Sequence, residues 1–235
     1  MHRTGALCTG DAEHSVLISN IMTIDNFSSL IDAFDMHPAT IYRGVASYNH
    51  HRLIPSVGRN ISFKYSKNKE ERMFHLFKEK AIPFLRELPR DDWEFLAVAQ
   101  HYGLPTRLLD WTWNPLVASF FAVLEYNEDD GAVYPLYAAM VPPHSPSMSP
   151  LESSGYCIYK PPHFDDRIIA QSGLFTSQDK PDKEFPADEC DVIIIPHRLK
   201  SDIRHRLRIM NIHTGSLFPS LEGVAMAIRE NDSYN

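Results

Sequence analysis

The stretch from Leu96 to Ala122, LAVAQHYGLPTRLLDWTWNPLVASFFA, constrains the fold more than any other part of this sequence. Its first residues belong to a helical pattern over Asp91–Tyr102, which opens with acidic residues that suit a helix N-terminus. A short extended segment, Thr106–Asp110, comes next. The second helical pattern, Pro115–Tyr126, has proline in its first turn, where proline is tolerated, and is apolar almost throughout. The stretch therefore predicts a strand between two helices, the second of them almost wholly buried.

Further elements are predicted on both sides of this stretch. Their order is irregular rather than a repeated strand–helix–strand unit, so the predicted class is α+β. We expect one domain over residues 26–235, preceded by an N-terminal arm over residues 1–25. The helical patterns are Asn26–Phe34, Lys69–Leu88 (kinked or divided at Pro83), Arg198–Arg208 and Leu221–Glu230; the strand patterns are Thr40–Val45, Ala132–Val141, Leu174–Ser177 and Val192–Pro196; Arg52–Arg59 and Pro142–Pro150 are predicted loops.

Composition narrows the class of protein. An apolar fraction of 43% supports one sizeable core and excludes a mostly disordered chain. The longest apolar run, Leu116–Leu124, is far shorter than the ~20 residues that span a bilayer. The three cysteines are widely separated, which suits a reducing cytoplasm and argues against a disulfide or zinc framework. The net charge of −7 argues against nucleic-acid binding through overall charge, but the run His197–Arg208 is locally basic.

Standard phosphate-loop, dinucleotide-binding, hydrolase and zinc-protease motifs are absent from the sequence, so polar residues in apolar surroundings are the remaining signal. Arg43 lies inside an apolar strand pattern, and a guanidinium is costly to bury unless it meets a carboxylate or a phosphate. Gly44 would let the backbone bend and a ligand approach closely. The alternative is a buried Arg–Asp pair that locks the strand.

Two other polar clusters are candidates for a site. The segment Gln100–Thr112 is either an internal hydrogen-bond network or a ligand pocket. At the entrance of the Pro115 helix, Asn114 is the favoured N-cap, whereas Asp110 lies too far upstream for that role. Gln171 precedes a small-residue turn, where it would face a groove or simply solvent.

Taken together, these residues resemble the FRG family, which is named for a short aromatic-Arg-Gly motif and occurs largely in bacterial and phage proteins. The resemblance covers most of residues 38–230. Its four blocks are Tyr42-Arg43-Gly44 with Leu53-x-Pro55, Leu96–Ala122, Arg167–Thr176 and Leu217–Ala225.

The order of these blocks is also similar, more distantly, to that of the arginine-class ADP-ribosyltransferases. This likeness implies an ADP-ribosyltransferase-like mixed sheet, with Arg43 holding a phosphate of NAD and an aromatic side chain such as Tyr102, Trp111 or Trp113 stacking on a ring of the dinucleotide. Asp110-Trp111-Thr112 stands where those enzymes have Ser-Thr-Ser, and their late Glu-x-Glu has no clear counterpart. Gln171 stands nearest the place that the catalytic carboxylate holds in those enzymes. Since glutamine carries no charge, Asp110 or Glu222 would supply the negative charge.

The resemblance thus implies an NAD-dependent ADP-ribosyltransferase, an intracellular toxin or antiphage effector that modifies a protein, RNA or DNA and is neutralised by an antitoxin. The alternative is a non-catalytic module that binds a nucleotide or phosphate. No metal site is expected. The catalytic residues expected are Arg43, Asp110 and Gln171, and the NAD-binding residues expected are Tyr42, Arg43, Gly44, Gln100, His101, Tyr102, Thr106, Arg107, Trp111 and Thr112.

Overall fold

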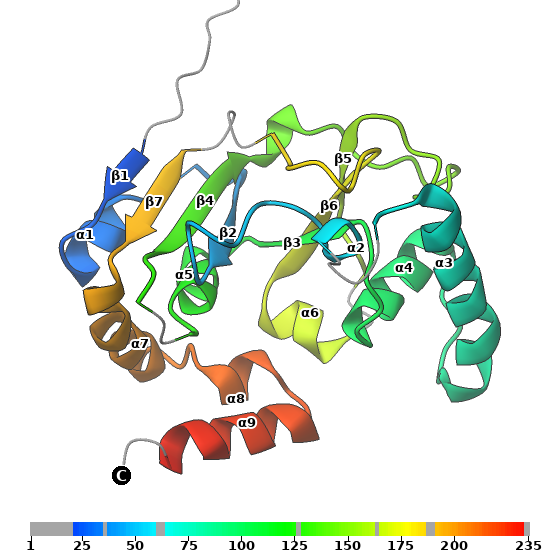
Figure 1. Cartoon of the computed structure of the whole chain (residues 1–235). Helices are drawn as coiled ribbons and strands as arrows, with labels where there is room; N and C mark the ends of the chain where they lie inside the picture. Colours follow the sequence, from blue (N-terminus) through cyan, green and yellow to red (C-terminus); the bar gives the residue numbers. More distant parts are fainter. Residues whose placement is uncertain are drawn as a thin grey trace, which may run out of the picture.

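The computed structural model describes residues 21–34, 37–59, 64–125, 128–162, 165–186 and 191–232. Its centre is a seven-stranded mixed sheet with the order β1-β7-β4-β2-β3-β6-β5 (Figure 1). Strand β1 runs parallel to β7, and the other neighbouring pairs are antiparallel. This sheet confirms the predicted α+β class. The strands are β1 Ile21–Thr23, β2 Thr40–Val45, β3 Leu108–Thr112, β4 Gly131–Tyr137, β5 Tyr156–Tyr159, β6 Gly173–Gln178 and β7 Val192–Ile195.

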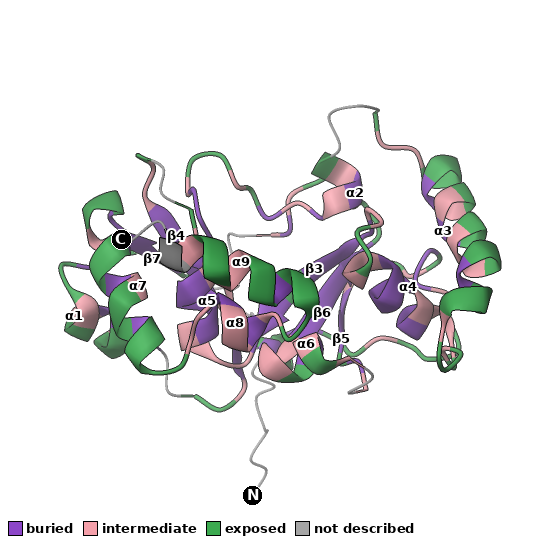
Figure 2. Ribbon diagram, turned by 90° about the horizontal axis from the view of Figure 1, so that it is seen from below, coloured by how far each residue is buried: buried purple, intermediate pink, exposed green. Residues whose placement is uncertain are grey.

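The helices gather mainly on one face of the sheet (Figures 1 and 2). The apolar α5 lies against β2 and β4, and it shares a core with α1, α7 and α8. Helices α3 and α4 form a second core with β3, β5 and β6. The helices are α1 Phe27–Asp32, α2 Ser56–Arg59, α3 Lys67–Ala81, α4 Asp92–His101, α5 Pro115–Ala122, α6 Asp166–Ala170, α7 Lys200–Ile209, α8 Thr214–Leu217 and α9 Leu221–Asp232.

Alternate side chains of strand β3 point to opposite faces of the sheet and so belong to different cores. Leu109 and Trp111 belong to the core on the face that is covered mainly by loops. Leu108 belongs to the core beneath α3 and α4, and Asp110 and Thr112 share its face by alternation. The candidate site is built around this strand.

Local chemistry explains the helix boundaries. The Asn114 side chain accepts a hydrogen bond from the Leu116 N–H at 2.9 Å, which confirms Asn114 as the N-cap of α5. The Asp91 side chain caps α4 in the same way through the Glu94 N–H at 2.8 Å. Pro83 divides the predicted Lys69–Leu88 helix, since α3 ends at Ala81 and a 3-10 turn follows over Ile82–Phe84.

Several predicted boundaries need correction. Residues Ile21–Thr23 of the predicted arm form β1 at the edge of the sheet, and residues 1–20 lie outside the described part of the chain. The predicted loop Arg52–Arg59 ends in α2. The predicted Ala132–Val141 strand ends at Tyr137, and α5 ends at Ala122 rather than Tyr126. Strand β5 and the short helices α6 and α8 were not predicted.

Within the described residues, none of the helices combines the length and apolar character needed to cross a membrane.

Candidate functional site

The two central strands separate where the site begins. Strand β2 pairs with β4 along Thr40–Val45, but its described ladder with β3 consists of one pair, Tyr42 with Thr112. Continued at that register, Gly44 would face Asp110. Instead, the Asp110 carbonyl accepts a hydrogen bond from Arg43 Nη1 at 2.6 Å. A backbone carbonyl within a sheet needs a hydrogen-bond donor. The Arg43 side chain supplies this donor to the Asp110 carbonyl in place of a backbone N–H of β2.

The Arg43 guanidinium is largely buried but incompletely bonded. Its side chain is 12% exposed, and Nη1 lies 3.6 Å from Asp110 Oδ2. Its Nε is buried and has no hydrogen-bond partner among the described residues. Burial lowers the pKa of Arg43 from its ordinary value, the Asp110 charge opposes that shift, and the Arg59 charge adds to it. A buried cation with a free donor beside a second cation favours an anion.

Asp110 presents its carboxylate to solvent while the neighbouring side chains orient it. Its side chain is 64% exposed, and Oδ1 accepts a hydrogen bond from Gln100 Nε2 at 2.7 Å. The side-chain amide oxygen of Gln100, Oε1, in turn accepts a hydrogen bond from the Thr106 hydroxyl. The Thr106 N–H donates to Ser56 Oγ at 2.9 Å, which ties α2 to the segment before β3. The predicted cluster is therefore a hydrogen-bond network that ends in an accessible carboxylate.

Asp110 lines a pocket of about 300 Å³ between α2, α4, β3, α6 and β6. Arg59 of α2 and Arg167 of α6 add two cations to its wall. A second cavity, about 420 Å³, adjoins it across His101 and Arg167 and reaches the start of α9. Such volumes suit a small organic ligand. Other lining residues of the first pocket are Ser56, Gln100, Gln171, Leu174 and Phe175.

His101 and Asp165 stand between the two cavities. His101 Nδ1 lies 3.1 Å from Asp165 Oδ2, and Asp165 Oδ1 also caps α6 by accepting from the Arg167 N–H at 2.7 Å. Helices α4 and α6 are thus joined at the pocket wall. The second cavity also contains Glu222, whose pKa is lowered by hydrogen bonds from its own backbone and from the Ser220 side chain.

Gln171 lines the first pocket, but its amide is already engaged. Its Nε2 donates to the Leu217 carbonyl at 3.0 Å, which joins the end of α6 to α8. Its backbone carbonyl accepts a hydrogen bond from the Thr112 hydroxyl at 2.6 Å. Gln171 and Thr112 therefore support the pocket wall from beneath β3.

Seven of the ten predicted NAD-binding residues are not among those that line the first pocket: Tyr42, Arg43, Gly44, Tyr102, Thr106, Arg107 and Thr112. The surroundings of three of them show what they do instead. Arg107 is 1% exposed and forms a two-contact ion pair with Glu70 of α3, at 2.8 and 2.7 Å. Tyr42 is buried in the core that contains α1 and α5. Gly44 serves helix packing rather than ligand approach, because a Cβ there would lie 1.7 Å from the Ala118 carbonyl oxygen.

The three predicted aromatic stacking residues have different surroundings. Trp111 lines the first pocket, but its side chain is buried and its indole N–H donates to Thr176 Oγ1 at 2.9 Å. Tyr102 is 71% exposed and borders the second cavity rather than the first. Trp113 packs partly buried against the core on the loop-covered face.

Sequence reasoning missed Ser56, Arg59 and Arg167 as wall residues. Ser56 and Arg59 fell in a predicted loop, and only the contact of α2 with the Thr106 backbone brings them to the pocket. Arg167 begins the block Arg167–Thr176, and the available signal was its position one helical turn before Gln171. Across the described ranges there is no group of three or more His, Cys, Asp or Glu side chains arranged to hold a metal ion.

Comparison with known proteins finds a family model that matches the segment containing β2 and β3. Residues 38–131 match the family model of the FRG domain. This segment runs from just before β2 to the first residue of β4 and contains Arg43, Gln100 and Asp110. The resemblance to the FRG family is thereby supported over this part of the chain. Neither the curated proteins nor the solved structures gave a significant match.

Proposed function

We propose that the protein is an NAD-consuming ADP-ribosyltransferase whose site is the pocket beside Asp110. One observation carries the proposal: the buried guanidinium of Arg43, whose Nε has no hydrogen-bond partner among the described residues, lies against the solvent-accessible carboxylate of Asp110 on a pocket wall. The first group suits a phosphate and the second suits a cationic transition state. NAD offers a partner for each group in one molecule. Its pyrophosphate is an anion that suits the guanidinium, and its ribose becomes cationic as nicotinamide leaves, which suits the carboxylate.

The cations of the site fit the anionic part of NAD. In the described part of the chain the Arg43 Nε donor has no partner, and Arg59 and Arg167 lie on the pocket wall beside Asp110. Burial, and to a smaller extent the charge of Arg59, lower the pKa of Arg43, and an anion bound near these cations would offset both effects. The two adjoining cavities offer room for a ligand with two linked parts.

Asp110 fits the reacting part. In the proposed reaction the C1′–N bond of NAD breaks, nicotinamide leaves with the bonding electron pair, and C1′ forms a bond with an acceptor nucleophile that loses its proton. Asp110 would stabilise the positive charge on the ribose and receive the acceptor proton. Gln100 and Thr106 hold the carboxylate in one orientation. Gln171 acts as a positioning residue, because its amide holds α8 in place.

The test is release of nicotinamide from NAD, measured by chromatography with and without a cell lysate as a source of acceptor. We expect Asp110→Asn, which preserves shape and removes charge, to slow release by about 10²–10³-fold. Its melting temperature is measured as a folding control, because the substitution removes the counter-charge of the buried Arg43 while keeping the hydrogen bond from Arg43 to the Asp110 carbonyl. Arg43→Lys should weaken NAD binding in calorimetry, since lysine lacks the planar fork that contacts a phosphate.

Asp32→Asn is the matched control, because it makes the same charge change at an exposed position on α1. It should behave as wild type. If wild type releases no nicotinamide under either condition, the transferase proposal is wrong. Binding of NAD or another nucleotide without turnover would favour the second candidate, a non-catalytic nucleotide- or phosphate-binding module, which the engaged amide of Gln171 also favours.

A transferase of this kind would endanger the cell that makes it. We therefore propose an intracellular toxin or antiphage effector with a macromolecular acceptor and a neutralising antitoxin protein. Growth after induced expression tests this role: wild type should be toxic, and Asp110→Asn at equal protein levels should not. Equal toxicity of the two proteins would show that the site lies elsewhere.

A further inference from the structure

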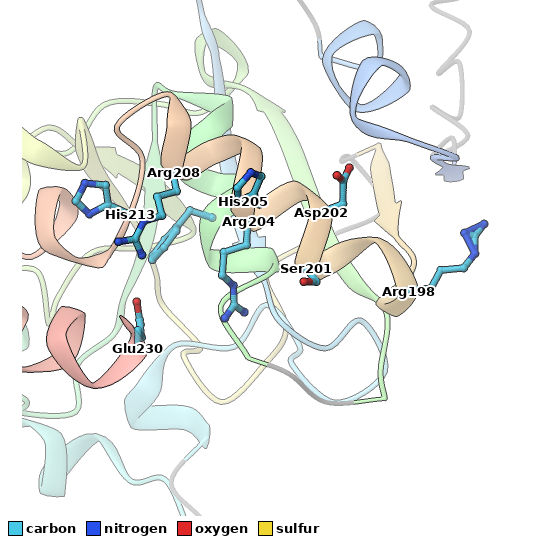
Figure 3. A pocket seen from close by; sticks show the side chains of 9 residues that line it. Arg198, Ser201, Asp202, Arg204, His205, Arg208, His213 and Glu230 are labelled. Carbon is cyan, nitrogen blue, oxygen red and sulfur yellow. The ribbon is translucent and has the colours of Figure 1, made fainter. Parts of the chain in front are cut away.

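The basic run predicted at His197–Arg208 forms one wall of a cavity separate from the candidate site. This cavity has a volume of about 770 Å³ and lies between α7, α8 and α9, and we call it the α7 groove (Figure 3). Buried Ile203 and Leu207 fix α7 against the core. The opposite side of the helix is thereby turned outward. The residues lining the groove include Arg198, Arg204, His205, Arg208, His213 and Glu230.

The charge of the α7 groove is positive although the chain carries a net charge of −7. Three arginines line it against two carboxylates, Asp202 and Glu230. Asp202 Oδ2 is neutralised by Arg206 Nε at 2.9 Å. Glu230 accepts hydrogen bonds from the Thr214 hydroxyl, at 2.7 and 2.6 Å. Of the groove arginines, Arg198 and Arg208 form no ion pair within the described part of the chain.

The arginines are spaced along α7, with Arg198 near its beginning, pointing away from the other two, and Arg204 and Arg208 further along (Figure 3). Arg204 Nη2 also donates to the Val123 carbonyl. Figure 3 shows Arg204 and Arg208 extending from α7 toward the same side, where His213 and Glu230 lie. The two arginines are four positions apart in the helix, which corresponds to about 6 Å along its axis. Like charges at this spacing destabilise a helix in isolation, whereas a ligand with repeated anionic groups would offset their repulsion.

We propose that the α7 groove binds single-stranded nucleic acid. Guanidinium groups bind phosphates, so Arg204 and Arg208 on one side of α7, with Arg198 further along the helix, suit the repeated phosphates of a nucleic-acid chain. His205 and His213 add flat rings on which unpaired bases stack. A duplex does not offer its bases in this way, because they are already stacked and paired.

Helix α9 connects the groove with the candidate site. Glu222 borders the second cavity near its beginning, and Glu230 borders the α7 groove near its end. These residues are about 12 Å apart along the helix axis. A strand held in the groove thus passes near the second cavity, which adjoins the pocket beside Asp110, and the bound nucleic acid is the acceptor. This last step rests on the proposed transferase function, whereas binding in the groove does not.

Fluorescence anisotropy of a labelled 15-nucleotide oligouridylate, measured on the full chain without NAD, tests the proposal. We expect Arg198→Gln/Arg208→Gln to weaken binding at least tenfold. A plot of the logarithm of the binding constant against the logarithm of the salt concentration should have a slope of roughly −2 for wild type, with three arginine contacts. The slope should be about −0.7 for the double variant, which keeps one. Arg72→Gln, an exposed arginine on α3, makes one comparable charge change away from the groove and should bind as wild type. Labelled oligothymidylate in parallel shows whether the groove distinguishes RNA from DNA.

Two results would overturn the proposal: absence of binding at 50 mM salt, or binding by the double variant with the wild-type affinity and salt slope. Equal competition by polyglutamate of matched charge would also overturn it and indicate an acidic protein partner. Both substituted positions are exposed, and circular dichroism confirms that the variants are folded. Nicotinamide release from NAD alone should be unchanged in the double variant. Absence of binding by wild type with normal release would therefore refute the groove alone, and binding without any release would refute the transferase alone.

Discussion

The buried pair between Arg107 and Glu70 offers a direct test of whether Arg107 is structural. The two side chains are 1% and 2% exposed, and two hydrogen bonds at 2.8 and 2.7 Å join them. Arg107 Nη1 also donates to the Pro150 carbonyl at 3.0 Å, and the Tyr65 hydroxyl donates to Glu70 Oε2 at 2.9 Å. The charged groups of the pair thus face protein partners rather than water.

Removal of one partner leaves the other as a buried, uncompensated charge. We expect Arg107→Met and Glu70→Met each to lower the free energy of unfolding by about 3–5 kcal/mol. With a urea m-value of about 3 kcal/mol per M for a chain of this size, a loss of ~4 kcal/mol moves the unfolding midpoint down by roughly 1.3 M. Urea titration followed by circular dichroism measures the shift.

The double variant distinguishes this explanation from a general effect of substitution in the core. Methionine at both positions removes both charges and leaves Pro150 and Tyr65 with one lost hydrogen bond each, which costs about 1 kcal/mol apiece. The double variant should therefore be more stable than either single variant. If its loss equals the sum of the two single losses, the charge argument is wrong.

Three further predictions concern other buried groups. Gly44→Ala should lower the melting temperature strongly or abolish folding, because its Cβ would lie 1.7 Å from the Ala118 carbonyl oxygen, whereas Gly173→Ala, with its nearest contact at 3.6 Å, should melt near wild type. Burial raises the pKa of Cys157 to about 11, so in a variant whose other two cysteines are serine the native protein should not react with a thiol reagent at pH 8 until urea unfolds it. Burial lowers the pKa of Lys200, so the unfolded state keeps its proton to higher pH than the folded state. The free energy of unfolding of wild type minus that of Lys200→Met should therefore rise as the pH approaches 10.5, and a constant difference would contradict this reasoning.

Part of the candidate site could be predicted because it depends on neighbours in the sequence. Gln100, Thr106 and Asp110 come from one short segment, and their hydrogen bonds join residues at most ten positions apart. The N-cap role of Asn114 follows from the two residues after it. The walls contributed by α2 and α6 could not be predicted in the same way, since long-range packing brings them to β3.

Arg43 and Arg107 show the limit of local reasoning. Both are arginines beside apolar strand residues, and both were expected to face NAD. Arg107 meets a carboxylate 37 positions earlier in the chain, whereas Arg43 reaches a carbonyl 67 positions later and keeps one donor without a partner among the residues that the structure describes. Nothing within a few residues of either arginine specifies these partners.

The sequence by itself determined the α+β class, most helices and strands, and the polar segment around Asp110, because periodicity, proline and capping residues act over a few positions. Only the tertiary structure decided that β2 and β3 separate at Arg43, that Gly44 admits α5, and that α7 turns its arginines toward α9. These features depend on which distant side chains meet when the sheet closes. A buried charge is costly until such a partner is in place, so the assembled core decides which arginine is neutralised and which stays available.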